Sequence, residues 1–78
     1  MISIIIPIYN EEKNIRKIQD NLSKLKGNFE VIFCDGGSSD RTVDLIDTSF
    51  TVINCPKGRA NQMNYGSKIS KGDVLFFL

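Results

Sequence analysis

Short apolar runs alternate with polar stretches along the whole of this 78-residue sequence. The apolar runs cover residues 2–8, 29–34, 50–54 and 74–78, and the polar stretches between them have the character of helices. Strands that alternate with helices pair in parallel, because each helix carries the chain back across the sheet. The pattern therefore predicts an α/β fold with a mostly parallel sheet and helices on both of its faces.

The first strand and the first helix have the strongest signals. The run from Ile2 to Ile8 is nearly continuous and β-branched, as expected for a strand buried on both faces. Asn10 is a suitable N-cap for the helix that follows, and Gly27 can take the left-handed conformation that ends it. The apolar stripe of this helix consists of Ile15, Ile18, Leu22 and Leu25.

The later elements are less clearly marked. Ser38 or Ser39 is placed to cap a short helix after the second strand. A last helix is expected from Arg59 to about residue 70, but it contains Gly66, which favours close packing on the sheet or on a ligand. Its apolar stripe is weak and consists of Ala60, Met63 and Ile69.

Composition excludes several classes of protein. The net charge of +1 provides no basic surface for nucleic acid, so no nucleic-acid partner is expected. Histidine is absent and Cys34 and Cys55 lack metal-ligand spacing, so the two cysteines are interpreted as small buried hydrophobic residues. No apolar run approaches the ~20 residues of a transmembrane helix, and no signal peptide is recognisable, which predicts a cytoplasmic location.

Polar residues follow the predicted strands, where parallel sheets bind their ligands. Tyr9 can stack on a base or close the core, and Glu11 can line a pocket or begin a helix. Asp35 can accept a hydrogen bond from a base or ribose, or form an ordinary Asp-Gly turn. Lys57 and Arg59 can bind a diphosphate at a helix N-terminus or form a solvated basic loop.

Three blocks of this sequence resemble family 2 glycosyltransferases over essentially the whole chain. They are ISIIIPIYNEEKNI, VIFCDGGSSDRTVDLI and PKGRANQMNYGSKISKGDVLFFL, and the last is similar to a bacterial subgroup associated with radical-SAM and selenium-related proteins. The resemblance implies a GT-A fold, whose Rossmann-like nucleotide-binding half would be a single partial domain at residues 1–78. It also implies that the nucleotide is held by Pro7, Tyr9, Glu11, Asp35, Arg59 and Asn64.

The activity implied is transfer of a sugar, with inversion, from a nucleotide-sugar that is expected to be a UDP-sugar. In the family, the DxD-type metal motif and the catalytic base lie beyond the strand that here ends at Leu78. We therefore expect no catalytic residue, no cofactor and no activity within this chain alone, and magnesium or manganese in the complete enzyme. The alternative is a truncated, non-catalytic module that binds a nucleotide or associates with itself.

Self-association is expected through the last strand. The family's strand order of three-two-one-four leaves the run from Val74 to Leu78 at one edge of the sheet. This run is apolar, uncharged and free of proline, which is typical of a strand that pairs with another chain. Two copies are therefore predicted to join along this edge.

Overall fold

The computed structural model describes residues 1–77, with side chains described for residues 1–73. Strands and helices alternate as the sequence predicts, although the second helix is only a single 3₁₀ turn. The elements, in chain order, are β1 (Ile2–Ile8), α1 (Ile15–Ser23), β2 (Phe29–Asp35), η1 (Val43–Leu45), β3 (Thr51–Asn54), α2 (Arg59–Ile69) and β4 (Val74–Phe77). Within the described chain, no helix is long and apolar enough to cross a bilayer.

The four strands form one parallel sheet in the order β3-β2-β1-β4, which confirms the predicted topology. β1 lies between β2 and β4, so that Ile5 faces Ile32 on one side and Phe77 on the other. Both edges of β1 are therefore paired, and its side chains are buried on both faces of the sheet, which explains why its sequence is apolar almost throughout. Leu78, the last residue of the predicted edge, lies outside the described residues.

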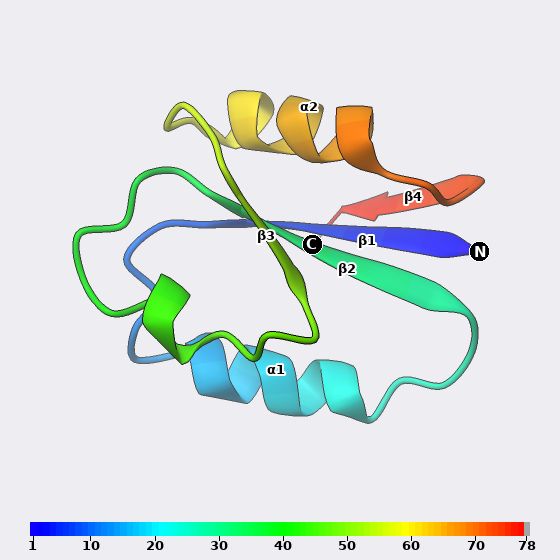
Figure 1. The fold of residues 1–78 in the computed structure, drawn as a ribbon, viewed down its shortest axis with the longest axis horizontal. Helices are drawn as coiled ribbons and strands as arrows, with labels where there is room; N and C mark the ends of the chain where they lie inside the picture. The colour runs from blue at the N-terminus through cyan, green and yellow to red at the C-terminus, as the bar shows by residue number, and fades with distance from the viewer. Residues whose placement is uncertain (78) are drawn as a thin grey trace.

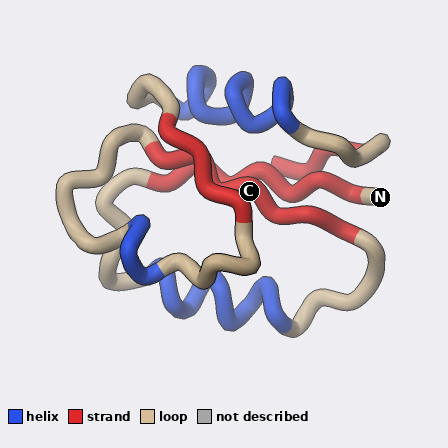
Figure 2. The backbone as a smooth tube through the Cα atoms, in the orientation of Figure 1, coloured by secondary structure: helices blue, strands red, loops and turns tan. Residues whose placement is uncertain are grey.

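Helices cover both faces of the sheet, with α1 and η1 on one side and α2 on the other (Figures 1 and 2). Alternate residues of β1 point to opposite faces, so Ile4, Ile6 and Ile8 pack toward α1 while Ile5 packs on the other face. The core under α1 is the larger one and includes Phe33, whose ring meets that of Phe50 edge to face at 5.6 Å.

Helix α1 begins later than the sequence suggested. Asn10 is not its N-cap: the residue has a left-handed φ of 50°, and Asn14 precedes the first helical residue. The predicted stripe is confirmed for Ile15 and Leu22, which are buried, and for Ile18, which packs against the core. Leu25 is 49% exposed because the helix ends at Ser23, before the stripe reaches it.

Helix α2 contacts the sheet through residues other than those predicted. Its buried residues are Gln62 and Gly66, whereas Ala60 and Ile69 of the expected stripe are exposed. A Cβ on Gly66 would lie 2.6 Å from both Cys34 Sγ and Ile5 Cγ2, so the helix backbone rests directly on the sheet. The close packing predicted for Gly66 is therefore confirmed.

The loop between α2 and β4 is fixed at the amino ends of the strands. Ser3 Oγ donates a hydrogen bond to Glu30 Oε2 at 2.5 Å, and the same carboxylate accepts one from Lys71 N. Gly72 N donates to Ser3 Oγ at 2.8 Å. The hydrogen bond from Ser3, followed by that from Lys71, holds the pKa of Glu30 below its ordinary value. These contacts set the register in which β4 joins β1.

Candidate functional site

The carboxyl ends of the first three strands meet at one edge of the sheet (Figure 1). Ile8 is the register partner of Asp35, which is in turn the partner of Asn54. Hydrogen bonds continue the pairing past the strand ends: Gly36 N donates to Ile8 O at 3.0 Å, and Cys55 N donates to Asp35 O at 2.8 Å. The loops that follow β1, β2 and β3 therefore start side by side.

Asp35 is 3% exposed and its carboxylate organises the turn after β2. Its Oδ2 accepts from Gly37 N at 3.1 Å and Ser38 N at 3.0 Å, and its Oδ1 accepts from Ser38 Oγ at 2.5 Å. A carboxylate can accept about four hydrogen bonds, so these contacts leave capacity for one more. Asp35 therefore forms the turn after β2, and a ligand contact would be an additional hydrogen bond to the same carboxylate.

Tyr9 and Lys57 bring the loops after β1 and β3 together. Lys57 Nζ lies 4.0 Å from the centroid of the Tyr9 ring, which is a cation-π contact. Tyr9 is 37% exposed, so it does not close the core. The Lys57 ammonium therefore lies over one face of this partly exposed ring, and together the two side chains offer an aromatic surface and a positive charge at one place.

The loop before α1 is hydrogen bonded to the turn after β2. Asn10 N donates to Ser38 Oγ at 2.8 Å, and Asn10 Oδ1 accepts from Ser39 N at the same distance. The sequence suggested that Ser38 or Ser39 caps a helix, but neither residue does so. η1 follows Thr42 instead, and no side-chain cap is formed there.

Thr42 and Asp40 complete this connection. Thr42 Oγ1 accepts from Glu11 N at 2.8 Å and donates to Asp40, while Asp40 Oδ2 accepts from Glu12 N at 3.2 Å. The hydrogen bond from Thr42 is the main reason that the pKa of Asp40 lies below its ordinary value. Asp40 thus has a structural role, because it joins the loop before α1 to the turn after β2.

The remaining predicted residues lie in different settings. Pro7 is half-buried opposite Cys34, and the half-buried Glu11 accepts a hydrogen bond from Asn14 Nδ2 at 3.2 Å. Arg59 is exposed at the first position of α2. Asn64 is exposed in the middle of α2, roughly opposite the buried side of the helix. The structure therefore groups Pro7, Tyr9 and Asp35 at the strand ends but does not bring Asn64 to them.

Sequence reasoning missed Gln62, the polar residue most firmly built into this edge. It is 4% exposed, and its Nε2 donates to Ile8 O at 2.9 Å and to Cys34 O at 2.7 Å. Its Oε1 accepts from Gly58 N at 3.2 Å. The available signal was spacing: Gly58, Gln62 and Gly66 recur every four residues and so share one side of the helix.

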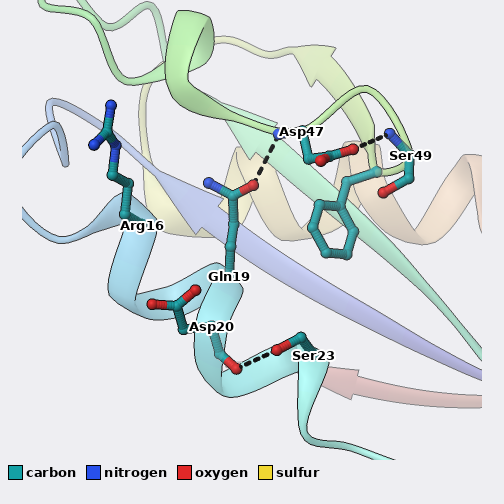
Figure 3. A pocket seen from close by; sticks show the side chains of 7 residues that line it. Arg16, Gln19, Asp20, Ser23, Asp47 and Ser49 are labelled. Atoms are coloured by element: carbon teal, nitrogen blue, oxygen red, sulfur yellow. Dashed lines mark hydrogen bonds between the residues drawn. The ribbon is translucent and has the colours of Figure 1, made fainter.

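A hollow of about 320 Å³ lies away from this edge, between α1 and the residues that precede β3 (Figure 3). Two of its polar side chains make internal hydrogen bonds: Gln19 Oε1 accepts from Asp47 N at 2.8 Å, and Asp47 Oδ1 accepts from Ser49 N at 2.9 Å. None of the predicted site residues lines it. The lining residues are Arg16, Gln19, Asp20, Ser23, Asp47, Ser49 and Phe50.

Among residues 1–73, no group of three or more potential metal-ligating side chains occurs. Cys34 and Cys55 are both buried, as predicted. Burial, together with the neighbouring Cys55, raises the pKa of Cys34 to about 12, so this thiol is protonated at neutral pH.

The parallel sheet with helices on both faces is a Rossmann-like fold, a class in which ligands bind beyond the carboxyl ends of the strands. The profile of glycosyl transferase family 2 matches residues 3–78, and the chain belongs to this family. An uncharacterized glycosyltransferase of Haemophilus influenzae is 40% identical, with 100% of this chain and 28% of that protein covered.

Two further relatives have names that specify a transfer reaction. The UDP-Glc:alpha-D-GlcNAc-diphosphoundecaprenol beta-1,3-glucosyltransferase WfaP of Escherichia coli is 38% identical over 100% of this chain and 34% of its own length. An undecaprenyl-phosphate 4-deoxy-4-formamido-L-arabinose transferase of Pseudomonas fluorescens is 28% identical over 99% of this chain and 26% of its own. The chain thus spans about a third or less of these relatives.

Proposed function

We propose that this chain is the nucleotide-binding part of an inverting glycosyltransferase that takes its sugar from a UDP-sugar. Family membership supports the reaction class, and the name of the Escherichia coli relative supports a uridine diphosphate carrier. Because the chain spans only part of its relatives, sugar transfer would belong to the whole protein. A bound magnesium or manganese ion in that protein stays a prediction, as do the bacterial subgroup and the cytoplasmic location.

The convergence of Tyr9, Asp35 and Lys57 at one sheet edge is the observation that carries the proposal. We expect the base to stack on the exposed ring of Tyr9 and to take the place that Lys57 occupies there. The remaining capacity of the Asp35 carboxylate suits the imide N–H of uracil. Lys57 and Arg59 would then face the diphosphate at the start of α2.

A matched pair of tyrosine variants tests this proposal. Tyr9 and Tyr65 are similarly exposed, and each lies beneath a lysine, at 4.0 Å and 5.5 Å respectively. UDP titrated into the chain and followed by NMR should shift the amides of the strand-end loops. Tyr9→Ala should weaken binding about tenfold, since stacking on a base is worth roughly 1–3 kcal/mol. Tyr65→Ala should have no effect, and equal effects of the two substitutions would contradict the proposal.

Self-association is a second candidate function, favoured by the position of β4. Within residues 1–77 this strand pairs with β1 alone and forms one edge of the sheet (Figure 1). An unpaired strand edge can join the same edge of another copy. Light scattering at tens of micromolar tests this, with Phe76→Lys as the variant that should restore a monomer. A monomer in both samples would exclude it.

A further inference from the structure

The side-chain amide of Gln62 joins three separate segments at the candidate site. It donates to Ile8 at the end of β1 and to Cys34 in β2, and it accepts from Gly58 before α2. A glutamine amide has two N–H donors and one oxygen, so every group of this side chain is engaged. Because Gln62 is 4% exposed, water does not compete for these hydrogen bonds.

Each of these three partners is directly bonded in sequence to a residue of the proposed nucleotide site. Ile8 precedes Tyr9, Cys34 precedes Asp35, and Gly58 follows Lys57. A hydrogen bond to the peptide group next to a residue restricts where that residue's side chain can point. The single amide of Gln62 is thus linked, through one peptide each, to all three candidate contacts.

Two glycines leave room for this amide. A Cβ on Gly36 would lie 3.1 Å from both Cδ and Oε1 of Gln62, so a larger residue there would press on the amide. Gly66 lets α2 approach until a Cβ at that position would collide with Ile5 and Cys34. The short distance between helix and sheet is what allows a glutamine to reach both strand ends.

We infer that Gln62 is a positioning residue of the nucleotide site, which fixes the relative placement of Tyr9, Asp35 and Lys57 without touching the ligand. This inference rests on the proposed function. Without the amide, the ends of β1 and β2 and the start of α2 lose their common anchor. The three candidate contacts then no longer meet one ligand at the same time, and affinity falls although all three side chains are present.

Gln19 provides a matched control on the opposite face of the sheet. Its Nε2 donates to Leu45 O at 2.9 Å and its Oε1 accepts from Asp47 N at 2.8 Å, as Figure 3 shows for the second contact. It therefore also bridges backbone groups, but none of them adjoins the candidate site. Methionine preserves the length of either glutamine while removing its hydrogen bonds, so Gln62→Met and Gln19→Met can be compared directly.

The experiment measures UDP affinity by calorimetry at a temperature where both variants are folded. The unfolding midpoint of each variant is measured separately. We expect Gln62→Met to weaken UDP binding at least about tenfold, the change that follows loss of one aligned hydrogen bond to a charged group. Gln19→Met should stay within about twofold of the original affinity. A purely structural role for Gln62 would lower the midpoint but leave the affinity of the folded protein unchanged.

The outcomes separate this inference from the proposed function. Binding of UDP by the original chain with equal affinity in Gln62→Met would overturn the positioning role alone. Absence of UDP binding in the original chain would overturn both proposals. If Gln62→Met does not fold, Gln62→Asn replaces it, because the shorter amide cannot reach both carbonyls, and the same loss of affinity is expected.

Discussion

The two faces of the sheet are covered in different ways. Under α1 the contact is made by large aliphatic and aromatic side chains, among them Ile15, Leu22 and Phe33. Under α2 the helix contributes a glycine and a glutamine, Gly66 and Gln62, to a smaller cluster that includes two cysteines. One helix is held mainly by apolar burial, and the other by close approach and directional hydrogen bonds.

This difference separates the contacts that stabilise the fold from those that fix the positions of the candidate site residues. Apolar contacts stabilise a helix strongly but tolerate small shifts, since dispersion and burial depend weakly on direction. Hydrogen bonds from a buried amide fix positions to within a few tenths of an ångström. We therefore expect α1 to contribute most of the folding free energy, while α2 defines the geometry of the candidate site.

Truncation of a buried α1 residue should have the largest effect. Ile15→Ala removes a side chain that is 0% exposed and should lower the free energy of unfolding by about 3 kcal/mol. Urea denaturation measures the loss. Leu25→Ala, at a residue 49% exposed just beyond the helix, is the control and should change stability by less than about 0.5 kcal/mol. Similar losses at both positions would contradict the assigned core.

Filling the contact under α2 should have a smaller effect. Gly66→Ala gains about 1 kcal/mol of helix propensity, but its Cβ overlaps Ile5 and Cys34 at 2.6 Å. The clash should outweigh the gain and leave the protein about 1–2 kcal/mol less stable. Asn64→Ala, in the exposed part of the same helix, should instead stabilise by up to about 0.5 kcal/mol. A Gly66→Ala variant more stable than the original would show that α2 does not rest on the sheet.

Removing a polar contact on the α1 side should lower stability by a smaller amount still. Thr42→Val leaves Glu11 N without its acceptor and should cost about 1 kcal/mol. The pKa of Asp40, held below 3.8 mainly by the Thr42 hydroxyl, should rise toward that value. Because the folded-state pKa of Asp40 is lowered, the hydrogen bond from Thr42 to the Asp40 carboxylate stabilises the fold above about pH 4, and this stabilisation is lost as the pH falls. Carboxyl NMR measures the shift, with Asp47 as the control whose pKa should not move.

Thiol reactivity gives the mildest test of the α2 face. Cys34 is 0% exposed and its pKa is raised to about 12, and the pKa of Cys55 is raised by burial as well. At pH 8 iodoacetamide should modify neither thiol except through unfolding, as read by mass spectrometry. The same reaction in urea is the control. Rapid modification of the folded protein would mean that α2 opens readily from the sheet.

The architecture was predictable from sequence where local and global preferences agree. The parallel sheet and the buried positions Ile15 and Leu22 follow from apolar spacing, whereas the strand order was implied by the family resemblance. The start of α1 was not predictable from the sequence. Asparagine is a good N-cap residue, but Asn10 instead forms hydrogen bonds with Ser38 and Ser39, which are distant in the sequence. Only the folded chain brings these segments together.

The candidate site was predictable by location more than by role. Polar loops at strand ends identified Tyr9 and Asp35, yet the turn-forming hydrogen bonds of Asp35 depend on the backbone conformation of Gly37 and Ser38. Gln62 was missed because a glutamine in a polar helical stretch has the sequence character of an exposed residue. Its burial depends on how closely Gly66 lets α2 approach the sheet, which no pattern of hydrophobicity records.

The two neighbours of β1 are separated widely along the chain, and this has a consequence for synthesis on the ribosome. Ile2 faces Phe29 on one side and Val74 on the other. The chain emerges amino end first, so one flank of β1 finds its partner early in translation. The other flank carries unpaired backbone groups until residues 74–77 have left the exit tunnel. The speed at which the intervening codons are read therefore sets how long the nascent chain is open to wrong partners.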